Sequence, residues 1–267
     1  MRITSPEPDT IATTTPLEVQ SLWLGPRFSK MERLAVSSFL RLGHTYRLYA
    51  YDDVADVPEG TSIADASQVL PKSSVFLDFE QAHYSTFSNI FRYKLLLERG
   101  GFWVDTDVVC LRPFRFASDY VLGFEQYADQ PPRVASCVIR APAGSQLMQT
   151  CYETSIRKDP MTLRWGEVGP ALLHEVAMRL DLAGSVLPYW TFNPVPFWQW
   201  RDVISSNPAK QLRTRWHLAR QPHAIHLWNE MWRRSGADKD VRYHNRCLYE
   251  TLKRRIDPQL PGSALRT

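Results

Sequence analysis

The sequence lacks the features that mark disulfide-rich, membrane-spanning and nucleic-acid-binding proteins. Its 267 residues include only four cysteines, which are widely spaced and form no Cys-x-x-Cys pair, as is usual in a reducing compartment. The longest stretch without a formal charge, residues 182–200, contains three prolines and therefore cannot form a regular membrane helix. The net charge is only +4 and no long basic run is present, so we expect no nucleic-acid partner.

The first ten residues lack the apolar core of a signal peptide, and we therefore expect a cytoplasmic protein. Part of the basic excess lies late in the chain, at 233–234 and 253–255. Because a basic edge attracts anionic lipid, peripheral association with the inner face of a membrane is a further expectation.

The order of predicted elements indicates an α/β protein. The chain is predicted to open a parallel sheet with a strand at 17–24, a helix at 30–42 capped by Ser29 and a strand at 46–51. Further strands are predicted at 120–124, 134–139, 186–187 and 224–228, and further helices at 145–157, 170–180 and 241–256. With no internal repeat, we expect one domain over 17–256, between a lead-in at 1–16 and a tail at 257–267.

The most informative segment runs from residue 88 to 113. It predicts a helix that ends at the pair Gly100-Gly101 and continues into a strand containing Asp105 and Asp107. The period of two along a strand places both carboxylates on one side. Two such neighbours repel each other unless a cation or shared proton intervenes, so the pattern predicts a site for Mn²⁺ or Mg²⁺.

The helix before this strand carries two polar residues on an apolar surface. Asn89 and Arg92 lie three positions apart and so share one face. The rest of the helix is rich in aliphatic and aromatic residues and is expected to be buried on most sides. Two polar side chains should therefore project together from a buried element.

Ser88-Asn89-Ile-Phe-Arg92 followed by Gly100-Gly101-Phe-Trp-Val-Asp105-Thr-Asp107 resembles the DXD signature of sugar-nucleotide-dependent glycosyltransferases. The resemblance is to family 32, and within it to the branch of the α-1,4-galactosyltransferases and of capsular polysaccharide synthesis. It extends over further segments in matching order, which begin at Ser21, Gly169, Phe192 and Ala224. Many relatives have Asp where this chain has Asn89, and an amide can still donate and accept there.

The resemblance implies a GT-A fold, with a single mixed and mostly parallel sheet flanked by helices. Residues 17–140 would form the nucleotide-sugar half and 141–256 the acceptor-side half. It further implies a metal-dependent and retaining transfer of a hexose from a nucleotide-diphosphate sugar, with UDP favoured over GDP. The acceptor would be a glycan or a lipid-linked molecule, for instance in bacterial polysaccharide biosynthesis.

The resemblance also implies roles for particular residues. Asp107 would contact the metal, Asp105 the metal, its water or the ribose, and Arg92 would join them in catalysis. His226 could complete the metal or diphosphate site, although a lone histidine is often structural.

On the donor side, Trp23 could stack on the base or simply pack in the core. Asn89 and Arg92 are placed against the donor sugar, with a helix salt bridge and cap as the alternative. Glu167 is expected to contact the donor or acceptor sugar.

An aromatic loop contains Trp190, Trp198 and Trp200. If exposed, these rings would form an acceptor wall or a membrane-facing patch, and if buried, a second small core.

Two other functions remain open at this point. A catalytically impaired carbohydrate-binding protein would fit the presence of Asn89. A phosphatase of the haloacid-dehalogenase kind also uses Asp-x-Asp, but its motif normally closes the first strand of the domain.

Overall fold

The structure of the protein is a computed structural model, which describes residues 17–78, 83–160, 162–163, 166–258 and 260. The expected lead-in at 1–16 and most of the expected tail at 257–267 lie outside the described residues.

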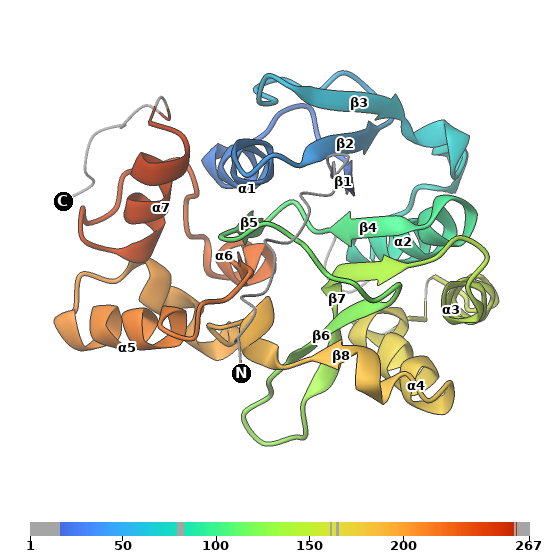
Figure 1. Cartoon of the computed structure of the whole chain (residues 1–267). Coiled ribbons are helices and arrows are strands. Elements are labelled where there is room, and N and C mark those ends of the chain that lie inside the picture. The colour runs from blue at the N-terminus through green and yellow to red at the C-terminus, as the bar shows by residue number, and fades with distance from the viewer. Residues whose placement is uncertain (1–16, 79–82, 161, 164–165, 259, 261–267) are drawn as a thin grey trace, which may run out of the picture.

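A seven-stranded sheet in the order β3-β2-β1-β4-β7-β6-β8 forms the centre of the molecule (Figure 1). Its strands are β1 (Glu18–Trp23), β2 (Thr45–Ala50), β3 (Thr61–Asp65), β4 (Gly101–Val104), β6 (Val121–Glu125), β7 (Arg133–Ala141) and β8 (Val186–Leu187). Only β7 runs antiparallel to its two neighbours, and the other pairs are parallel. The predicted mixed and mostly parallel sheet is confirmed, although a second, two-stranded sheet accompanies it.

The first helix, α1 (Lys30–Arg41), begins where the sequence predicts. The Ser29 hydroxyl accepts a hydrogen bond from the Met31 N–H, and the Glu32 carboxylate accepts one from the Ser29 N–H at 2.8 Å. This capping box satisfies two backbone donors that the helix leaves unpaired. Gly43 follows the helix with a φ of +81°, which only glycine adopts readily.

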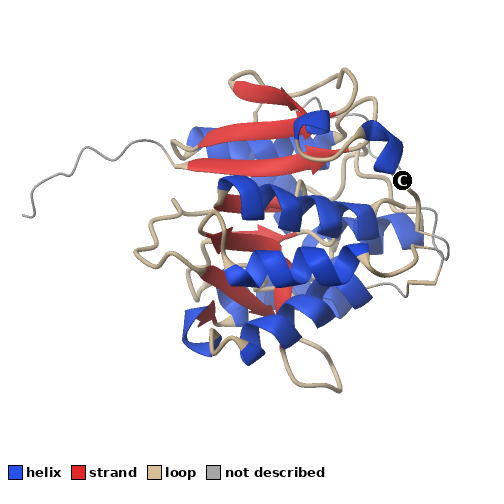
Figure 2. Ribbon diagram, turned by 90° about the vertical axis from the view of Figure 1, so that its right-hand side faces the viewer, coloured by secondary structure: helices blue, strands red, loops and turns tan. Residues whose placement is uncertain are grey.

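Helices cover both faces of the sheet. Figure 2 shows α2 (Ser85–Arg99), α3 (Gln146–Ile156) and α4 (Leu172–Arg179) packed against one face. The first hydrophobic core lies beneath them, and the second lies on the opposite face beside α1. A third core joins α1 to the short helix α6 (Asn229–Ser235) and to α7 (Leu248–Ile256). The sheet and the helix α2 are therefore held rigidly at the position of the DXD motif.

The structure differs from the predicted elements at several places, and β3 is one strand that was not predicted. The strand expected through residues 102–109 breaks into β4 and a separate strand, β5 (Val108–Cys110), which pairs with β9 (Ala224–His226) in a second small sheet. The terminal helix begins at Leu248 rather than at 241. Helix α6 and the helix α5 (Pro208–Leu218) were not predicted. Within the described residues, the helices are too short or too polar to cross a bilayer.

Candidate active site

Asp105 and Asp107 lie in the turn that joins β4 to β5, not on one continuous strand as predicted. The Asp105 N–H still donates to the Cys137 carbonyl of β7 at 2.8 Å, and the Val108 N–H donates to the Asp105 carbonyl at 3.0 Å. The chain leaves the large sheet at Asp105 and enters the small sheet at Val108. The two carboxylates converge because the turn folds them together, and not because of strand periodicity.

The carboxylate of Asp105 is held by two side chains. Arg92 of α2 forms an ion pair with Oδ1 at 3.1 Å, and the Trp103 indole N–H donates to the same oxygen at 2.7 Å. The guanidinium of Arg92 also stacks over the Trp103 ring at 4.9 Å and donates to the Ser136 carbonyl and to Ser88. Arg92 is only 4% exposed, so its position is fixed by these contacts.

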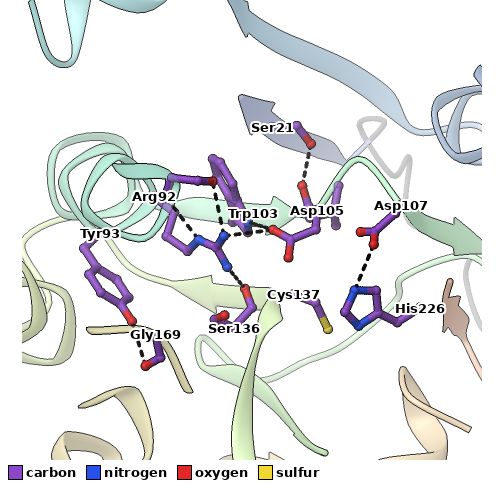
Figure 3. A network of polar contacts seen from close by, with 12 residues as sticks. Ser21, Arg92, Tyr93, Trp103, Asp105, Asp107, Ser136, Cys137, Gly169 and His226 are labelled. Carbon is purple, nitrogen blue, oxygen red and sulfur yellow. Dashed lines mark hydrogen bonds and ion pairs between the residues drawn. The ribbon is translucent and has the colours of Figure 1, made fainter. Parts of the chain in front are cut away.

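The carboxylate of Asp107 is held from the opposite side, by residues far away in the sequence. Its Oδ2 lies 3.1 Å from Nε2 of His226, the last residue of β9, and accepts the backbone N–H of Asn229 at 2.7 Å. Figure 3 shows Arg92 and Trp103 approaching Asp105 and His226 approaching Asp107. Pairing of Val108 with His226 between β5 and β9 brings the histidine to this place.

Asp105, Asp107 and His226 form a cluster that could hold a metal ion, since one ligand atom from each lies within 4.8 Å of the others. Each aspartate uses one oxygen in the contacts above. In the described part of the chain the second oxygen of each carboxylate has no side-chain donor. Two carboxylate oxygens and one imidazole nitrogen are ligands that suit Mn²⁺.

The charges of Asp105, Asp107 and His226 alter one another's pKa. Burial raises the pKa of Asp105, and the charge of Asp107 raises it further, although Arg92 opposes both effects. Burial also disfavours ionisation of Asp107, but the contacts from His226 and Asn229 outweigh it and lower the pKa of Asp107. Burial opposes the charge of His226, yet Asp107 raises the pKa of His226 well above its ordinary 6.5. Without a metal, His226 therefore carries a proton that a metal must displace.

His226 is oriented by residues around it. The Asn193 side-chain oxygen lies 3.2 Å from Nδ1 of His226, and the Asn193 amide nitrogen donates to the Phe124 carbonyl at 3.1 Å. The indole of Trp228 lies against the imidazole, with 4.0 Å between ring centroids, and donates to the Val195 carbonyl at 2.7 Å. Trp228 has a φ of +58°, which is rare for a bulky residue and is found at functional sites.

Two family models match this chain. Residues 29–128 match the glycosyltransferase sugar-binding region containing the DXD motif, and residues 143–259 match the alpha 1,4-glycosyltransferase conserved region. Together they cover more than half of the chain and include all three residues of the cluster. This chain belongs to the DXD-containing glycosyltransferases. It is therefore a transferase enzyme, as the sequence resemblance implied.

Among solved structures, this glycosyltransferase is similar to PaToxG glycosyltransferase, at a TM-score of 0.45 and 12% identity over 89% of this chain and 86% of that one. It is also similar to the apo form of the glycosyltransferase GlyE of Streptococcus pneumoniae TIGR4, at a TM-score of 0.46 and 14% identity. That match covers 91% of this chain and 64% of GlyE. A sequence search of curated proteins finds no match.

The sheet of this glycosyltransferase has the GT-A arrangement that the resemblance implied. The DXD motif follows β4 at its carboxyl end, and β4 is parallel to its neighbour β1. Ligands bind at this end of the strands in open α/β sheets.

Two predicted donor residues each hold a buried polar atom that has no hydrogen-bond partner among the described residues. Trp23 ends β1 and packs edge-on against Phe28, with 5.2 Å between ring centroids, and no described residue forms a hydrogen bond with its buried indole nitrogen. Asn89 of α2 is 6% exposed, and its side-chain oxygen likewise has no such partner. Its amide lies against Gly169, where an added Cβ would lie 2.8 Å from Nδ2.

Two other predicted donor residues have partners within the protein. Arg92 was expected to face the donor sugar, but the donors of its guanidinium are directed to Asp105, Ser88 and Ser136. Glu167, in the segment before α4, forms an ion pair with Lys158.

The aromatic loop divides between the two alternatives. Trp190 and Trp198 are 37% and 41% exposed, whereas Trp200 is 5% exposed and packs against Trp232 with ring centroids 5.4 Å apart. The prediction of an acceptor role for Trp200 is contradicted by its burial, because a sugar cannot reach its ring.

Three residues near the site were missed from the sequence. Asn193 and Trp228 support His226, and Glu125 is a buried carboxyl at the end of β6 that accepts the Tyr127 hydroxyl at 2.5 Å. Burial raises the pKa of Glu125, the charge of Asp105 raises it further, and His226 opposes this. Asn193 and Trp228 fall inside segments that carry the family resemblance, and this was the signal available for them.

Proposed function

We propose that this glycosyltransferase transfers a hexose from a nucleotide-diphosphate sugar, with UDP favoured over GDP, to a glycan or lipid-linked acceptor, with retention and with Mn²⁺ or Mg²⁺. The observation that carries the proposal is the convergence of Asp105, Asp107 and His226 within 4.8 Å beside the carboxyl ends of β1 and β4. The donor atoms are those that such an ion accepts.

In the proposed site, Asp105, Asp107 and His226 hold the ion. A bound ion would neutralise the negative charge that grows on the leaving diphosphate, which is worth several kcal/mol. Arg92 and Trp103 keep the Asp105 carboxylate fixed and favour its charged form against burial. Arg92 therefore acts in this proposal through Asp105, as a positioning residue.

The donor sugar and base are proposed to lie against Asn89 and Trp23. Both side chains hold a buried polar atom that forms no hydrogen bond within the part of the chain that the structure describes. Such atoms are rare in native structures, and a ligand is one explanation for them. The Asn89 oxygen would accept a sugar hydroxyl, and the exposed rings of Trp190 and Trp198 would contact the acceptor.

The test is release of nucleoside diphosphate from a panel of UDP- and GDP-sugars with and without Mn²⁺. We expect turnover with at least one donor, dependent on added metal, and an α-linked product from an α-linked donor by NMR. Metal-independent turnover at the full rate would contradict the metal site while leaving the transferase assignment intact. Binding of sugars without turnover of any donor would indicate a carbohydrate-binding protein instead.

A further inference from the structure

Helix α5 has its apolar and polar residues on the opposite sides from those expected of a surface helix. Its buried residues are polar, Gln211, Thr214 and His217, whereas Leu212 and Trp216 are 67% and 56% exposed. On an ordinary surface helix the apolar residues face the core. No residue of α5 belongs to the three hydrophobic cores as described.

The buried side of α5 is held by hydrogen bonds instead of apolar contacts. The Gln211 amide donates to the Ser205 carbonyl at 3.1 Å, and His217 Nε2 lies 3.2 Å from the side-chain oxygen of Gln199. The helix is thus attached firmly, with its apolar side chains directed outward. Leu212 and Trp216 are four residues apart and share one face.

Basic residues surround these exposed side chains. The stretch 203–229 contains four arginines and lysines and no aspartate or glutamate. Lys210 and Arg213 are partly neutralised by the buried Asp202, but Arg215 and Arg220 have no carboxylate partner among the described residues. The face therefore carries uncompensated positive charge.

Arg220 joins this face to the aromatic loop. Its guanidinium lies over the rings of Trp216, Trp190 and Tyr189 at 4.4, 5.3 and 5.7 Å. We define the docking face as Leu212, Arg215, Trp216 and Arg220, the first three of which lie on α5, the helix at the lower left of Figure 1.

We infer that the docking face binds the surface of an anionic lipid bilayer. Charge complementarity selects this occupant, because the face combines positive charge with exposed tryptophan and leucine, and lipid headgroups supply the negative charge. Tryptophan settles at the interface between lipid and water. One short helix gives weak and reversible binding, which suits an enzyme that meets a membrane-held acceptor from the aqueous side.

The test is co-sedimentation of the full chain with vesicles. We expect binding to an equal mixture of phosphatidylcholine and phosphatidylglycerol, little binding to phosphatidylcholine alone, and weaker binding at high salt. The double variant Arg215→Glu/Trp216→Ser should lower partitioning into the mixed vesicles by about tenfold or more.

The control is Ile156→Ser/Arg157→Glu at the end of α3, where Ile156 is 51% exposed and precedes Arg157, an arginine that, unlike Arg215, forms an ion pair with a carboxylate, that of Glu153. This variant should bind like the unmodified protein. Thermal unfolding shows whether the double variant is folded. If it is not, the single variant Leu212→Gln, at the more exposed of the two apolar positions, is tested in place of the double variant.

Three outcomes would overturn the inference. These are no binding to the mixed vesicles, equal binding to both kinds of vesicle, and an equal loss in the α3 control. Dimerisation in ultracentrifugation that Trp216→Ser abolishes, without vesicle binding, would show that the face binds a second copy of the chain. Donor turnover without lipid is measured separately and does not bear on this inference.

Discussion

The side-chain oxygen of Asn193 lies 3.2 Å from Nδ1 of His226, and this contact determines which ring nitrogen faces Asp107. The Asn193 amide nitrogen donates to a backbone carbonyl, so its oxygen must be the atom that faces the histidine. An oxygen only accepts, and Nδ1 must therefore carry a proton. Nε2 is then the nitrogen that can bind a metal once it loses its own proton.

Replacing Asn193 should weaken metal binding. In Asn193→Leu the histidine loses its acceptor at Nδ1, and we expect the affinity for Mn²⁺ to fall by roughly tenfold to a hundredfold. Calorimetric titration measures it. Because Asn193 is buried, unfolding without metal is measured in parallel, and an unchanged Mn²⁺ affinity in a folded variant would refute the orienting role.

Metal affinity should rise with pH. The pKa of His226 lies well above 6.5, so at neutral pH the metal competes with a proton, and the affinity increases until His226 is deprotonated. The folding stability of the metal-free protein should instead fall as pH rises. The ion pair with Asp107 stabilises it fully below the ordinary histidine pKa, and this stabilisation is lost as pH rises through the raised value. In His226→Gln both trends should disappear, as shown by Mn²⁺ titrations and melting curves at several pH values.

The substitution Asp107→Asn should lower kcat by about a hundredfold or more, since it removes a charged ligand of the proposed metal. Asp119→Asn is the control, because its carboxylate is 82% exposed in a loop before β6. Nucleoside diphosphate release is the measurement. Full turnover by Asp107→Asn would rule out a direct metal contact for this residue.

Arg92 should contribute to both stability and metal binding. Arg92→Met leaves the Asp105 carboxylate without its ion pair, and we expect the free energy of unfolding to fall on the order of 3 kcal/mol. The pKa of Asp105 should rise further, because Arg92 is the main group that lowers it. Denaturant unfolding and Mn²⁺ titration test this. A loss of donor affinity with normal metal binding would instead favour the direct sugar contact that the sequence predicted.

Gly169→Ala should raise the KM for the donor by severalfold, because the new Cβ would lie 2.8 Å from the Asn89 amide and displace it. Gly184→Ala is a suitable control, since apart from its chain neighbours no described residue has an atom within 4 Å of the added Cβ, and its φ is not positive. Steady-state kinetics on an active donor measures the effect. If KM stays constant while Asn89 is displaced, the donor sugar does not contact Asn89.

The local parts of the fold could be predicted from the sequence. The cap at Ser29 and the glycine pair after α2 depend on neighbouring residues, and they lie where expected. The break between Asp105 and Val108 could not be predicted, because the residues that attract β5 to a second sheet are more than a hundred positions away in β9. Helix α5 was missed because its buried side chains are polar and give no hydrophobic period.

The candidate site was predictable to the same degree. The two aspartates are close together in the sequence and indicate a metal by their own chemistry. The role of His226 in the metal site could be predicted only through the family resemblance. The partners of Arg92 and Asn193 depend on how strands distant in sequence meet, and no local pattern encodes them.

The left-handed backbone of Trp228 turns the chain so that the next N–H, that of Asn229, reaches Asp107. Glycine would adopt this conformation with less strain, but it would leave the imidazole of His226 uncovered. Selection for thermal stability and selection for turnover should therefore favour different residues at position 228. A library screened only for heat tolerance could enrich glycine there and yield well-folded molecules that are poor catalysts.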